Sequence, residues 1–183
     1  YGIACCVSYQ EIGKRIQHFG ARCNLGKTLL LAINGGKEED EGVQVMDPTL
    51  FESVDNEDGS LNYDKVWANF KKAMENVARV YAKTMYIIHY MHDKYYYEKA
   101  QMAFMDSNYG VDIAYGIAGL SIVADSLSAI RFAKTKAIRD ENGVAKSFET
   151  EGEFPMYGND DDRVDSMAVE VQKFFMEELR KYK

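Results

Sequence analysis

The sequence has 183 residues, enough for one domain with a sizeable core and at most two. Hydrophobic residues make up 46% and charged residues 28%, as in ordinary soluble globular proteins. The formal net charge of -7 argues against nucleic acid or an anionic membrane as the main partner. No stretch approaches the roughly 20 apolar residues of a membrane-spanning helix, and the first residues lack a signal-peptide layout. Three cysteines, two of them adjacent, favour a reducing cytoplasm over a disulfide framework.

The first part of the chain is predicted to contain one short helix between irregular segments. Residues 1–10 are typical of a strand or an extended loop. Asn24 is a suitable N-cap for a helix over 27–33, which Gly35-Gly36 would end. Residues 37–60 are acidic and rich in Gly, Asp and Asn, so they are expected to lie at the surface.

A long helix is predicted from Tyr63 to about Met91, with Asn62 as its cap. Its apolar residues recur at a spacing of three and four, which indicates one buried stripe. The members of this stripe are Val66, Phe70, Met74, Val77, Tyr81, Met85 and Ile88. A second helix is predicted over 96–105.

The last third of the chain is predicted to hold two further helices and a hairpin. A helix covers about 120–133, and the turn signal Asp140–Gly143 favours pairing of 137–139 with 144–149. Acidic residues open a final amphipathic helix over 160–181, where they complement the helix dipole. The chain is therefore expected to be mostly helical with little β structure.

Cys5 and Cys6 are the first residues that require a chemical explanation. A disulfide between adjacent cysteines would be strained, and a zinc site uses more widely spaced ligands. Two neighbouring thiols in a cytosolic protein are more often simply packed than functional. A thiol redox module is the weakest alternative, because no second motif accompanies the pair.

Ordered motifs around and beyond this pair are distributed along the chain from Gly2 to Pro155. They are Gly2-Ile3-Ala4-Cys5-Cys6-Val7-Ser8, Ile12-Gly13-Lys14, Phe19-Gly20-Ala21-Arg22, Asn24-Leu25, Ala32-Ile33-Asn34-Gly35-Gly36, Leu61-Asn62-Tyr63-Asp64, Ile87-Ile88-His89-Tyr90-Met91-His92-Asp93-Lys94-Tyr95, Gly116-Ile117-Ala118-Gly119-Leu120-Ser121, Ala124-Asp125-Ser126-Leu127-Ser128-Ala129-Ile130 and Glu151-Gly152-Glu153-Phe154-Pro155. Together they resemble the pyruvate formate-lyases, a family of glycyl radical enzymes, with a gap only in 37–60.

The resemblance implies the α/β class, with the segment drawn from the ten-stranded α/β barrel of the intact enzyme. Residues 1–23 would form the active-site cysteine loop and substrate-binding stretch, and 24–183 the mainly helical surround, all within one catalytic domain. The implied activity is that of a formate C-acetyltransferase, an acyltransferase. It cleaves pyruvate by radical chemistry and transfers the acetyl group to coenzyme A, which yields acetyl-CoA and formate.

The resemblance also assigns roles to four residues. Cys6 would relay the radical and Cys5 would carry the acetyl group. Arg22 would hold the pyruvate carboxylate, and Phe19 would wall the substrate pocket, although ordinary core packing explains Phe19 almost as well. The cofactor would be a protein glycyl radical outside this segment, and no metal is needed. A metal at His89, His92 and Asp93, which share a predicted helix face, is a minor alternative.

The intact enzyme would be a cytoplasmic homodimer of anaerobic glucose metabolism, activated by a radical-SAM enzyme. Related dehydratases and decarboxylases carry Glu two residues after a single cysteine, whereas this chain has Ser8 there. A lyase for 2-ketobutyrate would share every motif. A silent helical fragment is the alternative from another class, since the radical glycine is not among these residues and the segment alone is expected to be inactive. Tyr9-Gln10 replace the Pro-Met usual in the family, which could alter the rigidity of the loop.

Overall fold

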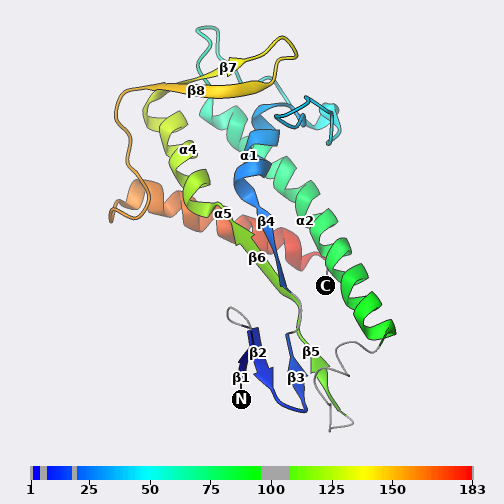
Figure 1. The fold of residues 1–183 in the computed structure, drawn as a ribbon. Helices are drawn as coiled ribbons and strands as arrows, with labels where there is room; N and C mark the ends of the chain where they lie inside the picture. Colours follow the sequence, from blue (N-terminus) through cyan, green and yellow to red (C-terminus); the bar gives the residue numbers. More distant parts are fainter. Residues whose placement is uncertain (1, 5–7, 18–19, 96–107, 183) are drawn as a thin grey trace. The chain divides into compact units, whose positions relative to one another are not determined.

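The computed structural model describes residues 2–4, 8–17, 20–95 and 108–182 (Figure 1). The chain mixes helices and strands and divides into two compact units. The first unit comprises residues 1–23 and 80–117, and the second comprises 24–79 and 118–183. Each unit is described by itself below.

The first unit contains two small sheets. Their strands are β1 (Gly2–Ala4), β2 (Ser8–Glu11), β3 (Arg15–Ile16) and β5 (Gly110–Val111) in one sheet, and β4 (Gly20–Asn24) and β6 (Ala114–Ala118) in the other. β1, β2 and β3 pair antiparallel in that order, and β3 pairs parallel with β5. Gly13, with φ of 82°, allows the tight turn between β2 and β3. Residues 1–10 are thus extended where the structure describes them.

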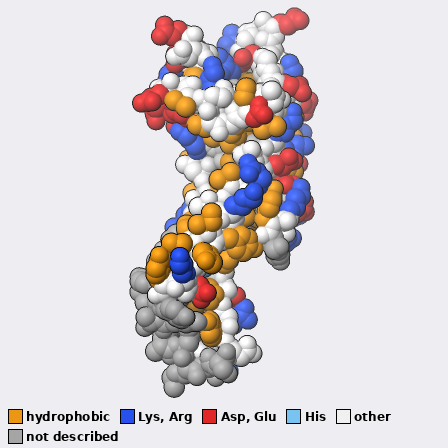
Figure 2. All heavy atoms as spheres, turned by 90° about the vertical axis from the view of Figure 1, so that its right-hand side faces the viewer, with side chains coloured by type: hydrophobic (Ala, Val, Ile, Leu, Met, Phe, Trp, Pro, Cys, Tyr) orange, Lys and Arg blue, Asp and Glu red, His pale blue; other side chains and the backbone are white. Residues whose placement is uncertain are grey.

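The long helix α2 (Tyr63–Lys94) contributes residues to both units. Its first turn is capped as predicted, because the Asn62 Oδ1 accepts a hydrogen bond from the Lys65 N–H at 3.1 Å. The predicted stripe is buried at Val66, Phe70, Met74 and Met85 and half-buried at Val77, Tyr81 and Ile88. Figure 2 looks onto the side of α2, where hydrophobic side chains also reach the surface.

The second unit is built from three further helices and a hairpin. They are α1 (Leu25–Ile33), α4 (Leu120–Phe132), α5 (Asp162–Arg180) and the antiparallel strands β7 (Lys134–Arg139) and β8 (Ala145–Glu151). α4 packs against α5 and α1. The Asn24 side chain accepts from the Lys27 N–H at 3.0 Å, and Asp161 caps α5. These elements confirm the predicted helices and hairpin, with longer strands than predicted.

The predicted surface segment 37–60 is largely exposed and contains one short 3-10 helix, Pro48–Leu50. It is anchored by the buried Val54 and by Asn69 of α2, whose side chain is only 1% exposed. The Asn69 amide donates to the Glu52 carbonyl at 2.8 Å, and its oxygen accepts from the Glu52 N–H at 3.2 Å. The buried side chain of Asn69 therefore satisfies both the N–H and the carbonyl group of Glu52, in a segment that is otherwise largely exposed.

Replacing Asn69 by Ala should lower the free energy of unfolding of the chain by about 1–3 kcal/mol, because the Glu52 groups lose their partner. Urea denaturation followed by circular dichroism measures this change. The matched control is Asn76→Ala on the same helix, which removes no hydrogen bond given for the described residues and should change stability by less than about 0.5 kcal/mol. Equal urea midpoints for the two variants would show that the Asn69 bonds contribute nothing.

The predicted helix over 96–105 lies outside the described residues. Strands β4 and β6 are present in the structure but were not predicted from the sequence. None of the helices in the described ranges is long and apolar enough to cross a bilayer.

Candidate active site

The adjacent cysteines Cys5 and Cys6, together with Phe19, lie outside the described residues. The strands that flank the cysteines in sequence are described, and they pair with each other. Ala4 is the partner of Ser8, and Gly2 is the partner of Gln10 in the antiparallel ladder between β1 and β2. Tyr9 and Gln10, which stand where the resemblance would place Pro-Met, are therefore residues of a paired strand.

Arg22 lies in the middle of β4 and its side chain is exposed. The following residue, Cys23, is 9% exposed, because successive side chains of a strand point to opposite faces. In the part of the chain that the structure describes, no carboxylate forms an ion pair with Arg22.

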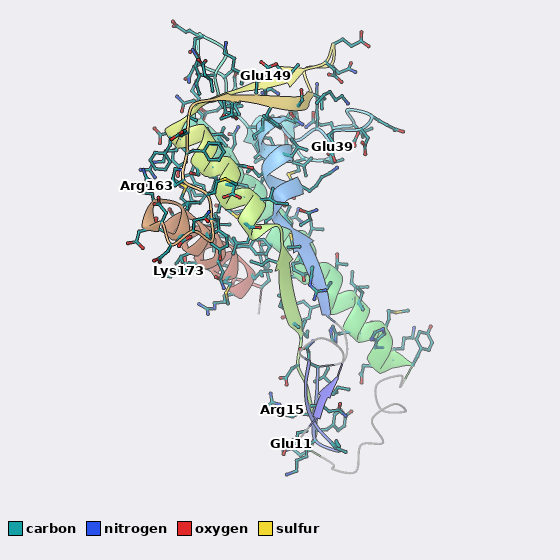
Figure 3. The ribbon with its side chains drawn as sticks, turned by 60° about the vertical axis from the view of Figure 1, so that its left-hand side comes forward. Glu11, Arg15, Glu39, Glu149, Arg163 and Lys173 are labelled. Atoms are coloured by element: carbon teal, nitrogen blue, oxygen red, sulfur yellow. The ribbon has the colours of Figure 1, made fainter. Side chains whose placement is uncertain are left out.

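Arg15, the other arginine of this unit's sheets, is already neutralised. Its guanidinium contacts both carboxylate oxygens of Asp112, at 2.6 Å and 3.2 Å. Figure 3 shows Arg15 beside Glu11, its partner in the ladder between β2 and β3. A bidentate pair of this kind occupies the face of a guanidinium that would otherwise bind a substrate carboxylate. Arg22 is thus better suited than Arg15 to hold a carboxylate.

Tyr81 connects α2 to the two strands of the second sheet. Its hydroxyl lies 2.7 Å from the Ala21 carbonyl oxygen of β4 and 3.2 Å from the Gly116 carbonyl oxygen of β6. Its ring meets the ring of Tyr115 edge to face, with centroids 5.3 Å apart. The sequence placed Tyr81 in an apolar stripe, and neither its hydrogen bonds nor its link to the strand of Arg22 was predicted.

His89 and His92 lie three residues apart on α2, as predicted, and their ring centroids are 6.3 Å apart. Among the described residues there is no group of three or more His, Cys, Asp or Glu side chains that could hold a metal ion. The minor alternative of a metal at His89, His92 and Asp93 therefore gains no third ligand from these ranges.

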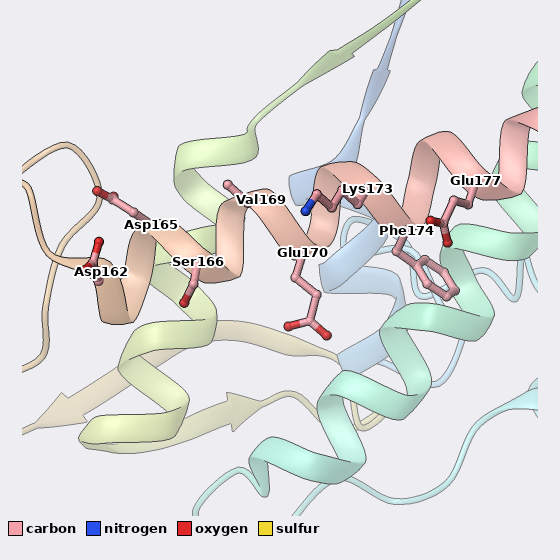
Figure 4. A pocket seen from close by; sticks show the side chains of 8 residues that line it. All are labelled: Asp162, Asp165, Ser166, Val169, Glu170, Lys173, Phe174 and Glu177. Atoms are coloured by element: carbon pink, nitrogen blue, oxygen red, sulfur yellow. The ribbon is translucent and has the colours of Figure 1, made fainter.

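Two of the surface hollows of the second unit are candidates for a ligand site, and neither contains a predicted site residue. One of about 720 Å³ is lined by α5 alone, and Figure 4 shows its acidic side chains beside Val169 and Phe174. The other, of about 340 Å³, is mostly apolar and lies among α1, α4 and the β7–β8 hairpin. A single helix face cannot enclose a ligand, and the apolar groove has no charged residue to orient one.

Comparison with known proteins shows the family to which the chain belongs. The family model described as pyruvate formate lyase-like matches residues 1–183. The PFL-like enzyme TdcE of Escherichia coli (strain K12) is 51% identical over 182 residues, which is 98% of this chain. The chain spans 23% of the length of that relative. A match over all residues, together with this identity, shows that the chain belongs to the pyruvate formate lyase-like family.

Proposed function

We propose that the intact enzyme is a formate C-acetyltransferase that cleaves pyruvate and transfers its acetyl group to coenzyme A. The observation that carries the proposal is the adjacent pair Cys5-Cys6 in a chain of the pyruvate formate lyase-like family. A single thiol is enough for acyl transfer. A second, adjacent sulfur is explained by a radical relay, because hydrogen atoms pass between neighbouring thiols at little energetic cost.

The two sulfurs have separate roles in this scheme. A glycyl radical outside the segment would supply the chemistry that removes a hydrogen atom from the Cys6 thiol. The Cys6 sulfur then takes the hydrogen atom of the Cys5 thiol, and the Cys5 sulfur adds to the keto carbon of pyruvate. The bond between that carbon and the carboxylate breaks, which leaves an acetyl thioester on Cys5. The released one-carbon radical takes a hydrogen atom from a thiol and becomes formate.

Coenzyme A completes the cycle by covalent catalysis with a ping-pong order. Its thiol displaces Cys5 from the acetyl thioester, so acetyl-CoA leaves and the Cys5 thiol is restored. Arg22 holds the pyruvate carboxylate until the carbon–carbon bond breaks, because a planar guanidinium can bind a carboxylate with two parallel hydrogen bonds. The exposure of Arg22 and the lack of an ion-pair partner for it in the described ranges support this role. Phe19 would help to exclude water from the substrate.

The remaining properties of the intact enzyme are proposed from its family. This segment would contribute to a ten-stranded α/β barrel in a cytoplasmic homodimer of anaerobic glucose metabolism. A radical-SAM activating enzyme would install the glycyl radical, and neither a metal nor nucleic acid nor a membrane takes part in turnover. The segment of 183 residues would be inactive alone, because the residue that bears the radical lies outside it.

The proposal is tested by incubating the activated intact enzyme with pyruvate labelled at its methyl carbon, without coenzyme A. Peptide mapping should find the label on Cys5, and addition of coenzyme A should release it as acetyl-CoA. Label on Cys6 would reverse the roles of the two sulfurs, and label on neither would refute the acetyltransferase. A parallel reaction with labelled 2-ketobutyrate distinguishes the two ketoacids by their relative kcat/KM.

A further inference from the structure

Tyr81 contacts the backbone of β4, the strand that contains Arg22, and not the Arg22 side chain. A tyrosine hydroxyl has one proton to donate, and the shorter of its two contacts, 2.7 Å, is to the carbonyl oxygen of Ala21. Ala21 immediately precedes Arg22 in β4. The longer contact, 3.2 Å, reaches Gly116 on the neighbouring strand. A single hydroxyl of α2 therefore meets both strands beside Arg22.

Gly116 lets the two strands approach at the same place. A Cβ atom at this position would lie 2.7 Å from the Ala21 carbonyl oxygen and 3.1 Å from the Cγ of Arg22. Real Cβ atoms essentially never approach a carbonyl oxygen so closely. Any side chain at this position would therefore displace the Ala21 carbonyl, and the stem of Arg22 would have to shift by a few tenths of an ångström.

The Tyr81 hydroxyl remains a donor at every pH at which the enzyme works. Burial raises the pKa of Tyr81 to about 12, and the nearby positive charge of Arg22 lowers it only in part. The edge-to-face contact with Tyr115 restricts the direction of the Tyr81 ring. The hydroxyl is thus fixed in direction and protonated, as a positioning group requires.

We propose that Tyr81 is a positioning residue for pyruvate binding, which fixes Arg22 by hydrogen bonding to the Ala21 carbonyl, with Gly116 providing room for the arginine stem. This inference rests on the proposed function. A carboxylate clamp requires both guanidinium N–H groups to meet the substrate oxygens in one plane. A hydrogen bond that holds the backbone of β4 in place also fixes the position of the Arg22 Cα, from which the guanidinium side chain extends. Tyr81 itself touches no substrate.

The test is Tyr81→Phe in the activated intact enzyme, a change that removes the hydroxyl and keeps the ring. The KM for pyruvate should rise about three- to tenfold, which corresponds to the usual net free-energy contribution of one hydrogen bond. The kcat and the KM for coenzyme A should stay unchanged, because only binding of the carboxylate is weakened. The glycyl radical content, measured by electron paramagnetic resonance, should equal that of the wild type.

A double-mutant cycle with Arg22→Lys separates positioning from general stability. Lysine keeps the charge but cannot form the bidentate clamp, so Arg22→Lys alone should raise the KM for pyruvate. If Tyr81 acts through Arg22, Tyr81→Phe should add little in the Arg22→Lys background. The matched control is Tyr90→Phe on the same helix, at a tyrosine that is 64% exposed, and it should change neither KM nor kcat beyond about twofold.

Gly116→Ala provides a second variant, which keeps the Tyr81 hydroxyl but crowds the Ala21 carbonyl and the stem of Arg22 from the other strand, and it should raise the same KM. An unchanged KM in Tyr81→Phe, equal losses for pyruvate and coenzyme A, or additive effects in the cycle would overturn the inference and leave the acetyltransferase intact. A wild-type enzyme that cleaves neither pyruvate nor 2-ketobutyrate would instead refute the proposed function, and the inference with it.

Discussion

Cys5→Ser in the activated intact enzyme should abolish acetyl-CoA formation while leaving the glycyl radical in place. Serine has the shape of cysteine, but its O–H bond is too strong to yield its hydrogen atom to a thiyl radical. The radical then passes no further than Cys6, so no sulfur radical arises at position 5 to add to the keto carbon of pyruvate, and no acetyl thioester forms there. Turnover should fall by at least about a thousandfold, as it does when a covalent nucleophile is removed from an enzyme.

Cys6→Ser should lose turnover to the same extent for a different reason. The radical would form but would not pass to Cys5, so labelled pyruvate should leave Cys5 unlabelled in this variant too. Electron paramagnetic resonance measures the radical and coupled assay of acetyl-CoA measures the turnover. The matched control is Cys23→Ala, which removes the buried thiol of β4 and should keep more than about half of the activity. Appreciable turnover by either serine variant would contradict the two-sulfur scheme.

The helices could be predicted from the sequence because each is specified by neighbouring residues. Asn24 and Asn62 accept hydrogen bonds from the first turns that follow them, and Asp161 does the same for α5. The three-and-four spacing of α2 likewise needs no information from elsewhere in the chain. The β7–β8 hairpin follows from its turn, in which the Asp140 N–H bonds to the Val144 carbonyl at 2.9 Å.

Strands β4 and β6 could not be predicted in the same way. They are five residues each, and they pair across about ninety intervening positions of the chain. Gly20–Asn24 alternates Ala21 and Cys23 with other residues but contains no β-branched or aromatic residue, while Ala114–Ala118 lies just before the predicted helix over 120–133 and received no prediction of its own. Pairing between distant segments leaves little trace in either segment alone.

The candidate site shows the same division between local and distant information. Cys5, Cys6, Phe19 and Arg22 were identified by resemblance to a family, and Arg22 alone of these lies in the described ranges. Tyr81 was assigned to the apolar stripe because its ring follows the helical spacing. Its hydroxyl acquires a role only from carbonyl groups contributed by two other segments, Ala21 and Gly116. Gly116, in contrast, belonged to a quoted motif whose steric reason became visible only in the structure.

The largest stability effect is expected at Phe175 of α5, whose side chain is 0% exposed. α5 packs against α4, and Ala124 of α4 forms a small buried cluster with Val164 and Ala168 of α5. Phe175→Ala removes a whole buried ring and leaves a cavity that surrounding helices fill only in part. It should lower the free energy of unfolding by about 3–5 kcal/mol. Such a loss is a large fraction of the roughly 5–15 kcal/mol that stabilises a typical domain.

Met176→Ala is the matched control, because Met176 follows Phe175 on the same helix and is 43% exposed. Its side chain loses little packing, so the free energy of unfolding should change by less than about 1 kcal/mol. Urea denaturation of the chain, followed at the helical circular dichroism band, compares the two variants directly. The contrast depends only on which face of α5 each residue occupies, since alanine restores good helix propensity at both positions. Equal losses at the two positions would mean that α5 does not bury Phe175 in solution, and the burial of this face of α5 would have to be rejected.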